Sequence, residues 1–330
     1  MKRCAAVLLL ALLLLSCAAA DGLVTAGGFR PDESALPYRT EDESAPAVYF
    51  LPEITPESLV AAYRALGVDL PGRVGVKMST GESTRSNYLR PALIADLVHL
   101  VNGTLVECNT AYGGNRASTA RHRQQAKDNG LLDVAGLDIL DEDGSMELPV
   151  EGGLRLSVDY VGAHFANYDS FLVLSHFKGH AMAGFGGAVK NISIGFGSSE
   201  GKAWIHTGGT SRRSMWGGQQ DAFLESMADA AKAVDSRMGE NIVYVSVLNR
   251  LSVDCDCDGN PAEPDMHDIG ILASTDPLAI DQAAVDLVYA MPDSASLVRR
   301  IERQNGLHTL EAGERNGLGS RRYRLVVIGD

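Results

Sequence analysis

The sequence predicts an α/β fold in which a mostly parallel or mixed sheet is flanked by helices. Short apolar runs alternate with helix-like segments along most of the chain, and residues 170–177 form the continuous apolar run typical of a strand buried on both faces. A second such run ends at Thr275-Asp276-Pro277, a helix cap followed by proline at the first helical position. Open α/β sheets bind ligands at the carboxyl ends of their strands, so we expect the site there.

Local patterns predict the individual elements in order, with Thr55 as the N-cap of the first helix and no internal repeat. Strands are expected at residues 47–51, 73–79, 104–108, 170–177, 242–247, 269–274 and 324–328. Helices are expected at residues 56–66, 91–101, 116–130, 222–237 and 277–289. We expect residues 45–330 to form a single α/β domain. Residues 18–44 are rich in Gly, Ala, Pro, Asp and Glu, which indicates a flexible tether.

The N-terminus is typical of an export signal. Lys2 and Arg3 precede an apolar run over residues 5–15, too short for a membrane span, and small residues follow it. The sequence Leu-Leu-Ser-Cys ending at Cys17 is similar to a bacterial lipobox, so residues 1–17 would direct lipidation of Cys17; ordinary signal cleavage near Ala20 is the alternative. We therefore expect an exported lipoprotein of the cell envelope, periplasmic or on the outer surface, held to the membrane by a lipid anchor.

Composition excludes two classes of protein. The 330 residues include 29 Lys and Arg against 42 Asp and Glu, a net charge of −13, and no basic block, so nucleic acid is not an expected partner. A hydrophobic fraction of 45% with 22% charged residues is typical of a globular domain rather than a disordered chain. A local cationic pocket remains compatible with this balance, and protein partners are not indicated.

The segment from residue 175 to residue 202 carries the strongest indication of a ligand. It follows the buried strand, and its glycines let backbone amides approach a ligand while its lysines add positive charge. This pattern predicts a site for a small anion such as a carboxylate or a phosphate, although no Walker A spacing is present; a tightly packed crossover is the alternative. The residues expected to bind the anion are Gly184, Gly186, Gly187, Lys190, Asn191, Lys202 and His206.

His176 and His180 lie four residues apart in this segment, with Lys178 between them. Two neutral imidazoles at this spacing can bind a metal together if the backbone is helical, or can transfer protons separately. One of them can instead simply bond a buried carbonyl. We take all three as candidate catalytic residues, and the two histidines also as candidate metal ligands.

A second cluster reads Asp-Cys-Asp-Cys-Asp-Gly over residues 254–259. An extended backbone would put Cys255 and Cys257 on one side, where their thiolates could bind a soft metal or an iron–sulfur centre with help from Cys108 or a histidine. A bridge between cysteines two residues apart is awkward, so free, metal-bound or Cys108-paired thiols are expected instead. The alternatives are a polar turn, or a calcium loop with ligands at Asp254, Asp256, Asp258 and Asp265. Iron–sulfur, zinc and calcium thus remain open.

A third segment, residues 76–91, also leaves a strand and enters a helix. Lys77, Glu82, Asn87 and Tyr88 can therefore face the same crevice as the glycine-rich segment. We take Lys77 and Glu82 as candidate catalytic residues and Asn87 as a candidate substrate contact. Glu82 can alternatively be no more than the ionic partner of Lys77.

These segments together resemble domain-of-unknown-function family 362 of bacteria and archaea. The resemblance runs over most of residues 46–290 and rests on the segments at 77–91, 176–191, 255–257 and 268–282. Members of the family are often labelled iron–sulfur or ferredoxin-like, but this chain contains no Cys-x2-Cys-x2-Cys-x3-Cys run. The resemblance implies a shared site built from these segments, without a defined reaction.

The leading functional hypothesis is a metal-dependent enzyme, redox or acid–base, that acts on a small anionic molecule. Convergent Lys, His and Cys residues at strand ends favour it, since a passive binder has less need of titratable groups. The alternatives are a non-catalytic lipoprotein that captures an anionic solute or cofactor, and a structural protein that binds a metal or calcium.

Overall fold

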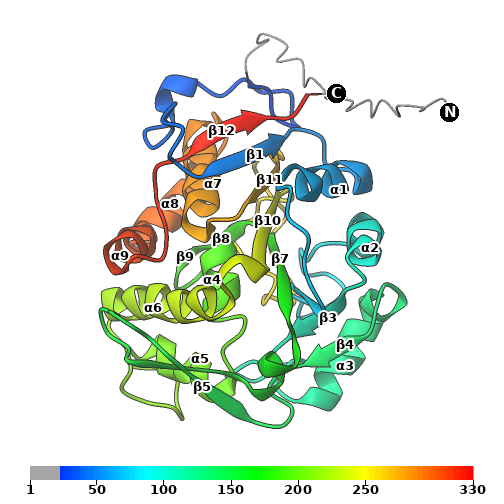
Figure 1. Cartoon of the computed structure of the whole chain (residues 1–330), viewed down its shortest axis with the longest axis vertical. Helices are drawn as coiled ribbons and strands as arrows, with labels where there is room; N and C mark the ends of the chain where they lie inside the picture. The colour runs from blue at the N-terminus through cyan, green and yellow to red at the C-terminus, as the bar shows by residue number, and fades with distance from the viewer. Residues whose placement is uncertain (1–22, 330) are drawn as a thin grey trace, which may run out of the picture.

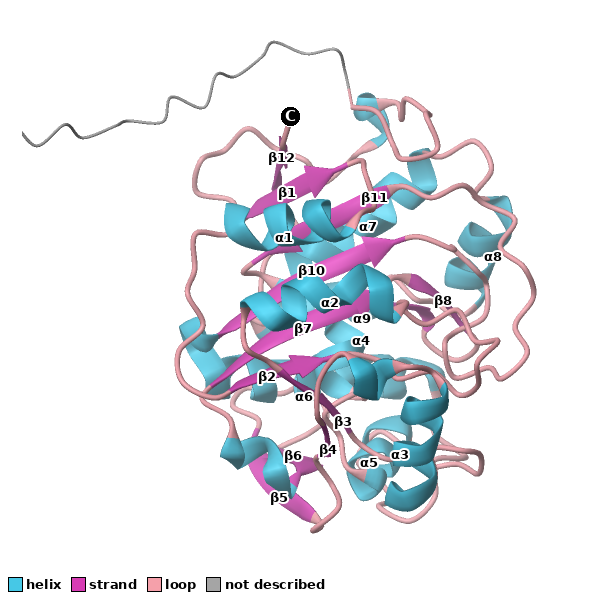
Figure 2. Cartoon of the chain, turned by 90° about the vertical axis from the view of Figure 1, so that its right-hand side faces the viewer, coloured by secondary structure: helices cyan, strands magenta, loops and turns pink. Residues whose placement is uncertain are grey.

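The computed structural model describes residues 23–329, and its centre is one eight-stranded sheet with helices on both sides (Figures 1 and 2). The strand order is β12-β1-β11-β10-β7-β2-β3-β4. The strands of this sheet are β1 (Ala47–Leu51), β2 (Val74–Lys77), β3 (Thr104–Glu107), β4 (Leu137–Ile139), β7 (Ser170–His176), β10 (Ile242–Leu248), β11 (Gly270–Ser274) and β12 (Arg324–Val327). Two small antiparallel sheets pair β5 (Ser145–Pro149) with β6 (Val158–Gly162), and β8 (Lys178–His180) with β9 (Gly184–Gly186).

Nine α-helices occur among residues 23–329. They are α1 (Pro56–Ala65), α2 (Pro91–Leu100), α3 (Thr119–Asp128), α4 (Ala188–Ser193), α5 (Ser199–His206), α6 (Gln220–Met238), α7 (Pro277–Ala290), α8 (Ala295–Arg303) and α9 (His308–Asn316). Short 3-10 turns lie at Glu33–Ala35, Leu131–Asp133, Ala163–Asn167 and Gly239–Asn241.

The sheet is mixed but mostly parallel, as the sequence predicts. Strand β11 alone among the described strands of this sheet runs antiparallel to its neighbours, β1 and β10. The pairs β1·β12, β10·β7, β2·β7, β2·β3 and β3·β4 are all parallel. The carboxyl ends of β2, β3, β7 and β10 therefore meet at one edge of the sheet.

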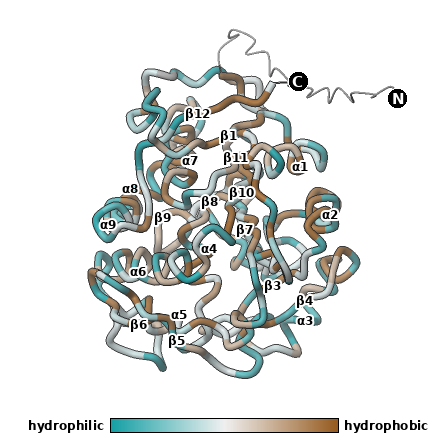
Figure 3. The backbone as a smooth tube through the Cα atoms, viewed as in Figure 1, coloured by the Kyte–Doolittle hydropathy of each residue, from teal (hydrophilic) through white to brown (hydrophobic). Residues whose placement is uncertain are grey.

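Strand β7 explains why the core has two halves. All seven of its residues are buried, and successive side chains alternate between the two faces. Phe171 and Val173 pack into the cluster with α4, α6 and α7, whereas Leu172 and Leu174 pack into the cluster with α1 and α2. The hydrophobic stretches, in brown in Figure 3, include β10, β12 and α2. Both faces of the sheet are thus covered by helices.

The predicted elements are confirmed with small shifts at their ends. The largest difference is at the predicted helix 116–130, which begins at Thr119.

The expected tether is wrong for residues 23–44. Leu23 and Leu36 are buried in the main core, and Ala26 donates its amide hydrogen to the Ile269 carbonyl at 2.9 Å. Composition indicated a tether because isolated apolar residues such as Leu23 and Leu36 form no periodic pattern in the sequence.

The predicted signal segment, including Cys17, lies outside the described residues. Within residues 23–329, no helix combines the length and the hydropathy needed to cross a membrane.

Candidate functional site

A cavity of about 430 Å³ lies at the carboxyl edge of the sheet, where the sequence places the ligand site. Its walls come from the segments after β2, β3 and β7, from α4 and α5, and from the loop that carries Cys255 and Cys257. Four cationic side chains line it against two carboxylates. These are Arg116, Lys178, Lys190 and Lys202, against Glu107 and Asp256. The cavity is therefore cationic in a protein whose net charge is −13.

Helix α4 holds Lys190 and Asn191 at the cavity, and a buried carboxylate fixes the start of this helix. Asp281 of α7 accepts hydrogen bonds from the amides of Ala188 at 2.7 Å and Val189 at 2.9 Å. A Cβ atom on Gly187 would lie 2.2 Å from an Asp281 oxygen, so this close approach requires glycine. Asp281, ambiguous in the sequence, is the cap of the helix that carries the site.

Lys190 is half-buried in the cavity wall and makes no hydrogen bond or ion pair with any described residue. Burial, followed by the charges of Lys178 and Arg116, lowers the pKa of its ammonium group to about 7. An unpaired buried cation is costly unless a ligand neutralises it or it loses its proton. Lys190 is therefore equipped to bind an anion and to change protonation near neutral pH.

His180 is held neutral, in one tautomer. Its Nδ1 atom accepts hydrogen bonds from the amides of Met182 at 3.2 Å and Ala183 at 2.9 Å, so the ring proton sits on Nε2. Burial and then the nearby charge of Lys190 hold the pKa of His180 well below its usual range. His180 thus presents a hydrogen-bond donor to its surroundings.

His206 has the opposite tautomer. Its Nδ1 atom lies 2.7 Å from the Lys202 carbonyl, which can only accept, so Nδ1 carries the proton and Nε2 keeps a lone pair. The ring stacks on Phe223 with the centroids 4.6 Å apart. Burial lowers the pKa of His206 to about 4, although the bond to the Lys202 carbonyl opposes this. The cavity therefore contains one neutral imidazole that donates and another that accepts.

Asp256 connects two of the predicted catalytic residues. His176 Nδ1 lies 2.7 Å from one of its oxygens, and Lys178 Nζ donates to the other at 2.9 Å. Burial alone would raise the pKa of Asp256, but Lys178 and His176 outweigh it and hold this pKa well below its usual range. The Nε2 atom of His176 faces the Asn249 carbonyl at 2.7 Å, so both ring nitrogens are already directed at protein oxygens and neither is directed at a metal.

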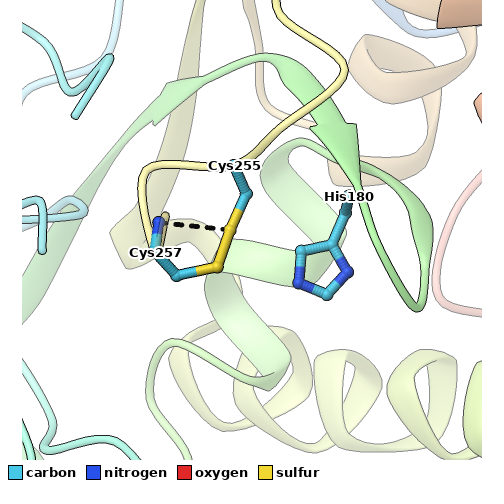
Figure 4. Close-up of side chains that lie close together, drawn as sticks. All are labelled: His180, Cys255 and Cys257. Carbon is cyan, nitrogen blue, oxygen red and sulfur yellow. Dashed lines mark hydrogen bonds between the residues drawn. A yellow bond between two sulfur atoms is a disulfide. The ribbon is translucent and has the colours of Figure 1, made fainter. Parts of the chain in front are cut away.

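Cys255 and Cys257 form a disulfide in the cavity wall, contrary to the sequence-based expectation (Figure 4). The chain turns between them, which brings their Cα atoms within 5.2 Å, and the extended backbone assumed from the sequence does not occur. Cys108 is the free cysteine of the described residues; it is buried, and burial raises the pKa of its thiol to about 12. Two of the alternatives that the sequence offered for Cys255 and Cys257, free thiols and pairing with Cys108, are therefore wrong.

A metal could be held by His180, Cys255 and Cys257, whose ligand atoms all lie within 4.8 Å of one another. Two conditions follow from the donor chemistry. First, the disulfide must be reduced, because thiolates are the ligands. Second, the proton of His180 must move from Nε2 to Nδ1, so that Nε2 can bind the metal. Nδ1 then no longer accepts the two backbone amides that it binds now.

The four aspartates of the calcium-loop pattern do not converge. Asp256 pairs with His176 and Lys178, while Asp254 lies 3.7 Å from Arg300. Asp258 accepts from the Asn260 amide at 2.8 Å, and Asp265 accepts from Ser296 at 2.6 Å. Each carboxylate therefore has its own partner, and the loop does not have the geometry of an EF-hand.

Lys77, Glu82 and Asn87 lie outside the cavity lining. Lys77 is fully buried behind it and donates to Asn191 Oδ1 at 2.9 Å; burial lowers the pKa of Lys77 to about 8, although Glu107 opposes the shift. Glu82 binds Arg116, and Asn87 binds Arg250. These residues support the site rather than line it. Lys202 does line it, and its Nζ donates to the Gly197 carbonyl at 2.6 Å.

Of the glycines, Gly186, Gly187 and Gly195 line the cavity, whereas Gly184 packs against Gly306 outside the lining. Sequence reasoning missed Glu107, Arg116 and Trp216. Glu107 ends β3, next to β2 in the sheet, so its place at a strand end was an available indication. Arg116 and Trp216 come from loops with no distinguishing pattern.

The fold and the cavity define an α/β protein with a cationic cavity at the carboxyl edge of its sheet. Residues 74–286, well over half of the chain, match the family model described as a domain of unknown function, number 362. The chain belongs to domain-of-unknown-function family 362, as the motifs at 77–91, 176–191, 255–257 and 268–282 predict.

Comparison with solved structures finds distant likenesses. The lactate racemase apoprotein from Thermoanaerobacterium thermosaccharolyticum aligns over 74% of this chain and 57% of its own, at 12% identity and a TM-score of 0.44. A protein from Thermotoga maritima aligns over 73% of this chain and 59% of its own, at 11% identity and a TM-score of 0.41. The chain thus spans less than two thirds of either protein. No curated protein matches this chain.

Proposed function

We propose that this protein is an enzyme that binds a small anionic molecule in the cavity and transfers a proton to or from it. The observation that carries the proposal is Lys190, a half-buried lysine without a partner among the described residues, in a cavity that also contains Arg116, Lys178 and Lys202. A carboxylate or phosphate group would satisfy this excess of positive charge. A pKa of about 7 lets Lys190 donate or accept a proton under ordinary conditions.

Three further side chains have compatible roles. His180 offers a hydrogen-bond donor and His206 an acceptor on the same cavity, so a substrate with both a carbonyl and a hydroxyl can be oriented. Lys178 is held in place by Asp256 and adds positive charge for the anionic group. The passive alternative, capture of an anionic solute without reaction, uses the same lysines but has no need of the two opposed imidazoles.

Trp216 provides a direct readout of binding, because it lines the cavity and is 68% exposed. We expect inorganic phosphate or malonate to change its fluorescence, with affinity at least ~10-fold weaker in Lys190→Met, since a loss of about 1.4 kcal/mol is tenfold. Affinity for malonate, whose two carboxylates stay ionised on both sides of pH 7, should fall as pH rises through about 7 in the wild type, because Lys190 loses its charge there, and this step should be absent from Lys190→Met. Lys127→Met, an exposed lysine on α3, is the matched control.

Catalysis is tested separately, by following exchange of the methyl protons of pyruvate in deuterium oxide by nuclear magnetic resonance. We expect exchange faster than in buffer, reduced at least ~100-fold in Lys190→Met, the lower end of what a general base contributes. Binding without exchange would favour passive capture. Equal phosphate affinity in wild type and Lys190→Met would contradict the proposal as a whole.

A metal-dependent reaction is the second candidate, favoured by the proximity of His180 to the two cysteines. It predicts that the reduced protein binds one zinc ion under anaerobic conditions, and that Cys255→Ser abolishes this binding. Unchanged zinc uptake by Cys255→Ser would contradict it.

We also propose export to the cell envelope with a lipid anchor at Cys17. The sequence of residues 1–17 supports this, and so does a disulfide, since disulfides persist mainly in oxidising compartments. Incorporation of labelled palmitate into the wild type but not into Cys17→Ser, in a bacterial host, is the test.

A further inference from the structure

We propose that Cys255 and Cys257 are a redox-active pair that exchanges two electrons with a small thiol carrying an anionic group, which enters the cavity. The preference for an anionic thiol rests on the proposed anion site, whereas the redox pair itself does not. The pair lies in the wall of the cavity, with Cys255 buried and Cys257 half-buried.

The disulfide is not needed to hold its loop. It closes a loop of only three residues, so it restricts the unfolded chain little. Other contacts already fix the segment: Asp256 binds His176 and Lys178, and its carbonyl accepts from the Glu82 amide at 3.0 Å. Arg300 donates to the Val253 carbonyl at 2.7 Å. The two sulfurs can therefore separate without loss of the surrounding structure.

The two sulfurs are not equivalent. The backbone amide of Cys257 donates to Cys255 Sγ at 3.2 Å, and such a donor stabilises negative charge on that sulfur. A ring nitrogen of His180 lies within 4.8 Å of both sulfurs (Figure 4). Since Cys257 is the more accessible cysteine, an incoming thiolate attacks Cys257 and expels Cys255.

The exchange balances with two thiols as the reductant. The first thiolate bonds to Cys257 Sγ, the bond between the two cysteines breaks, and its electron pair leaves on Cys255 Sγ. A second thiolate attacks the sulfur of the first thiol and expels Cys257 Sγ. Two thiols are oxidised to one disulfide, the protein disulfide is reduced, and the two thiol protons end on the cysteines. In the reverse direction the same step reduces a small anionic disulfide.

The cavity selects the charge of the thiol. Lys178 and Lys190 line the same space as the disulfide, and Gly186 lies beside both lysine stems. A carboxylate on the thiol can contact these ammonium groups while its sulfur reaches Cys257. A cationic thiol would meet like charges, which opposes its entry.

The first experiment measures native reduction of the oxidised full-length chain by 3-mercaptopropionate, 2-mercaptoethanol and 2-aminoethanethiol. Alkylation with iodoacetamide and mass spectrometry quantify the peptide that carries both cysteines, with the buried Cys108 as an internal reference. Each rate is divided by the rate at which the same thiol reduces a small linear disulfide, which removes its intrinsic reactivity. We expect a normalised rate at least ~10-fold higher for the anionic than for the cationic thiol. Lys190→Met should reduce this preference, with Lys178 still lining the cavity, and Lys127→Met should retain it in full.

The second experiment tests which sulfur is attacked. Cys255→Ser, treated with the disulfide of 3-mercaptopropionate, should form a mixed disulfide at Cys257. Cys257→Ser should react at Cys255 at least ~10-fold more slowly, because that sulfur is buried. Equal melting temperatures of the two variants ensure that neither result reflects unfolding; a variant that fails to fold is replaced by the corresponding Ala variant.

The outcomes separate the inference from the proposed function. Resistance of the native disulfide to all three thiols would overturn the redox pair, even if phosphate still binds through Lys190. Reduction without charge preference, with phosphate binding intact, would overturn the anionic substrate class. Reaction at Cys255 as fast as at Cys257 would overturn the assigned direction of attack.

Discussion

Lys190 and Asp159 are ionisable side chains whose charged atoms make no well-formed side-chain hydrogen bond to any described residue. Their surroundings give them different meanings. Lys190 faces the cavity, so a ligand can satisfy it, whereas Asp159 of β6 is fully buried and does not line the cavity. The first is therefore a candidate functional group, and the second is a cost to stability.

Asp159 makes stability depend on pH. Burial raises its pKa from 3.8 to about 7, so the folded state retains a proton that the unfolded state releases between these values. The contribution of Asp159 to the free energy of unfolding is therefore fully present below pH 3.8 and is lost as pH rises to about 7. We compare the free energy of unfolding of Asp159→Asn with that of the wild type at two pH values. We expect this difference to favour Asp159→Asn by about 2–4 kcal/mol more at pH 8 than at pH 4.

Urea unfolding at both pH values measures this difference, with Asp133→Asn as an exposed control. The asparagine amide has its own burial cost at every pH, so the change with pH is the quantity that matters. A difference between Asp159→Asn and wild type that does not vary with pH would contradict the assignment.

At the scale of elements, helix α4 is too short to be stable alone and depends on Asp281 of α7. We expect Asp281→Ala to lower the free energy of unfolding by about 1–3 kcal/mol, through two unsatisfied backbone amides. It should also weaken phosphate binding, because α4 positions Lys190. Denaturant unfolding and the Trp216 titration measure the two effects, with exposed Asp96→Ala on α2 as control. Lower stability with unchanged phosphate affinity would separate α4 from the site.

The short elements also explain which parts of the fold sequence patterns miss. Strands β8 and β9 have three residues each, and α4 has six, too few for a period to be visible. Helix α3 begins at Thr119, with Ser118 at its N-cap, three residues later than composition suggests. Strand β8 carries Lys178 and His180, and helix α4 carries Lys190. The candidate site therefore lies where local sequence patterns are weakest.

At the scale of the whole molecule, β12 protects the edge of the sheet. It pairs in parallel with β1 from Ala47 to Phe50, and the Ile328 amide donates to the Phe50 carbonyl at 2.9 Å. Deletion of residues 324–330 would expose the backbone of β1, an apolar strand, to other chains. We expect a lower melting temperature and concentration-dependent self-association, measured by scanning calorimetry and light scattering. Deletion of residues 329–330 alone should behave as wild type, and a monodisperse, equally stable 324–330 deletion would contradict the role of β12.

The sequence by itself determined the α/β class, most long elements, the family and the edge of the sheet at which the cavity lies. It could do so because the long apolar runs and the helix cap at Asp276 are patterns within a few neighbouring residues, and because parallel strands bring their carboxyl ends to one edge.

Only the tertiary structure decided which side chains meet in the cavity. The disulfide depends on a turn between Cys255 and Cys257, and the state of His180 depends on the Met182 and Ala183 amides. Asp256 pairs with His176 and Lys178 across 80 and 78 residues of chain, and no local pattern encodes contacts at that separation.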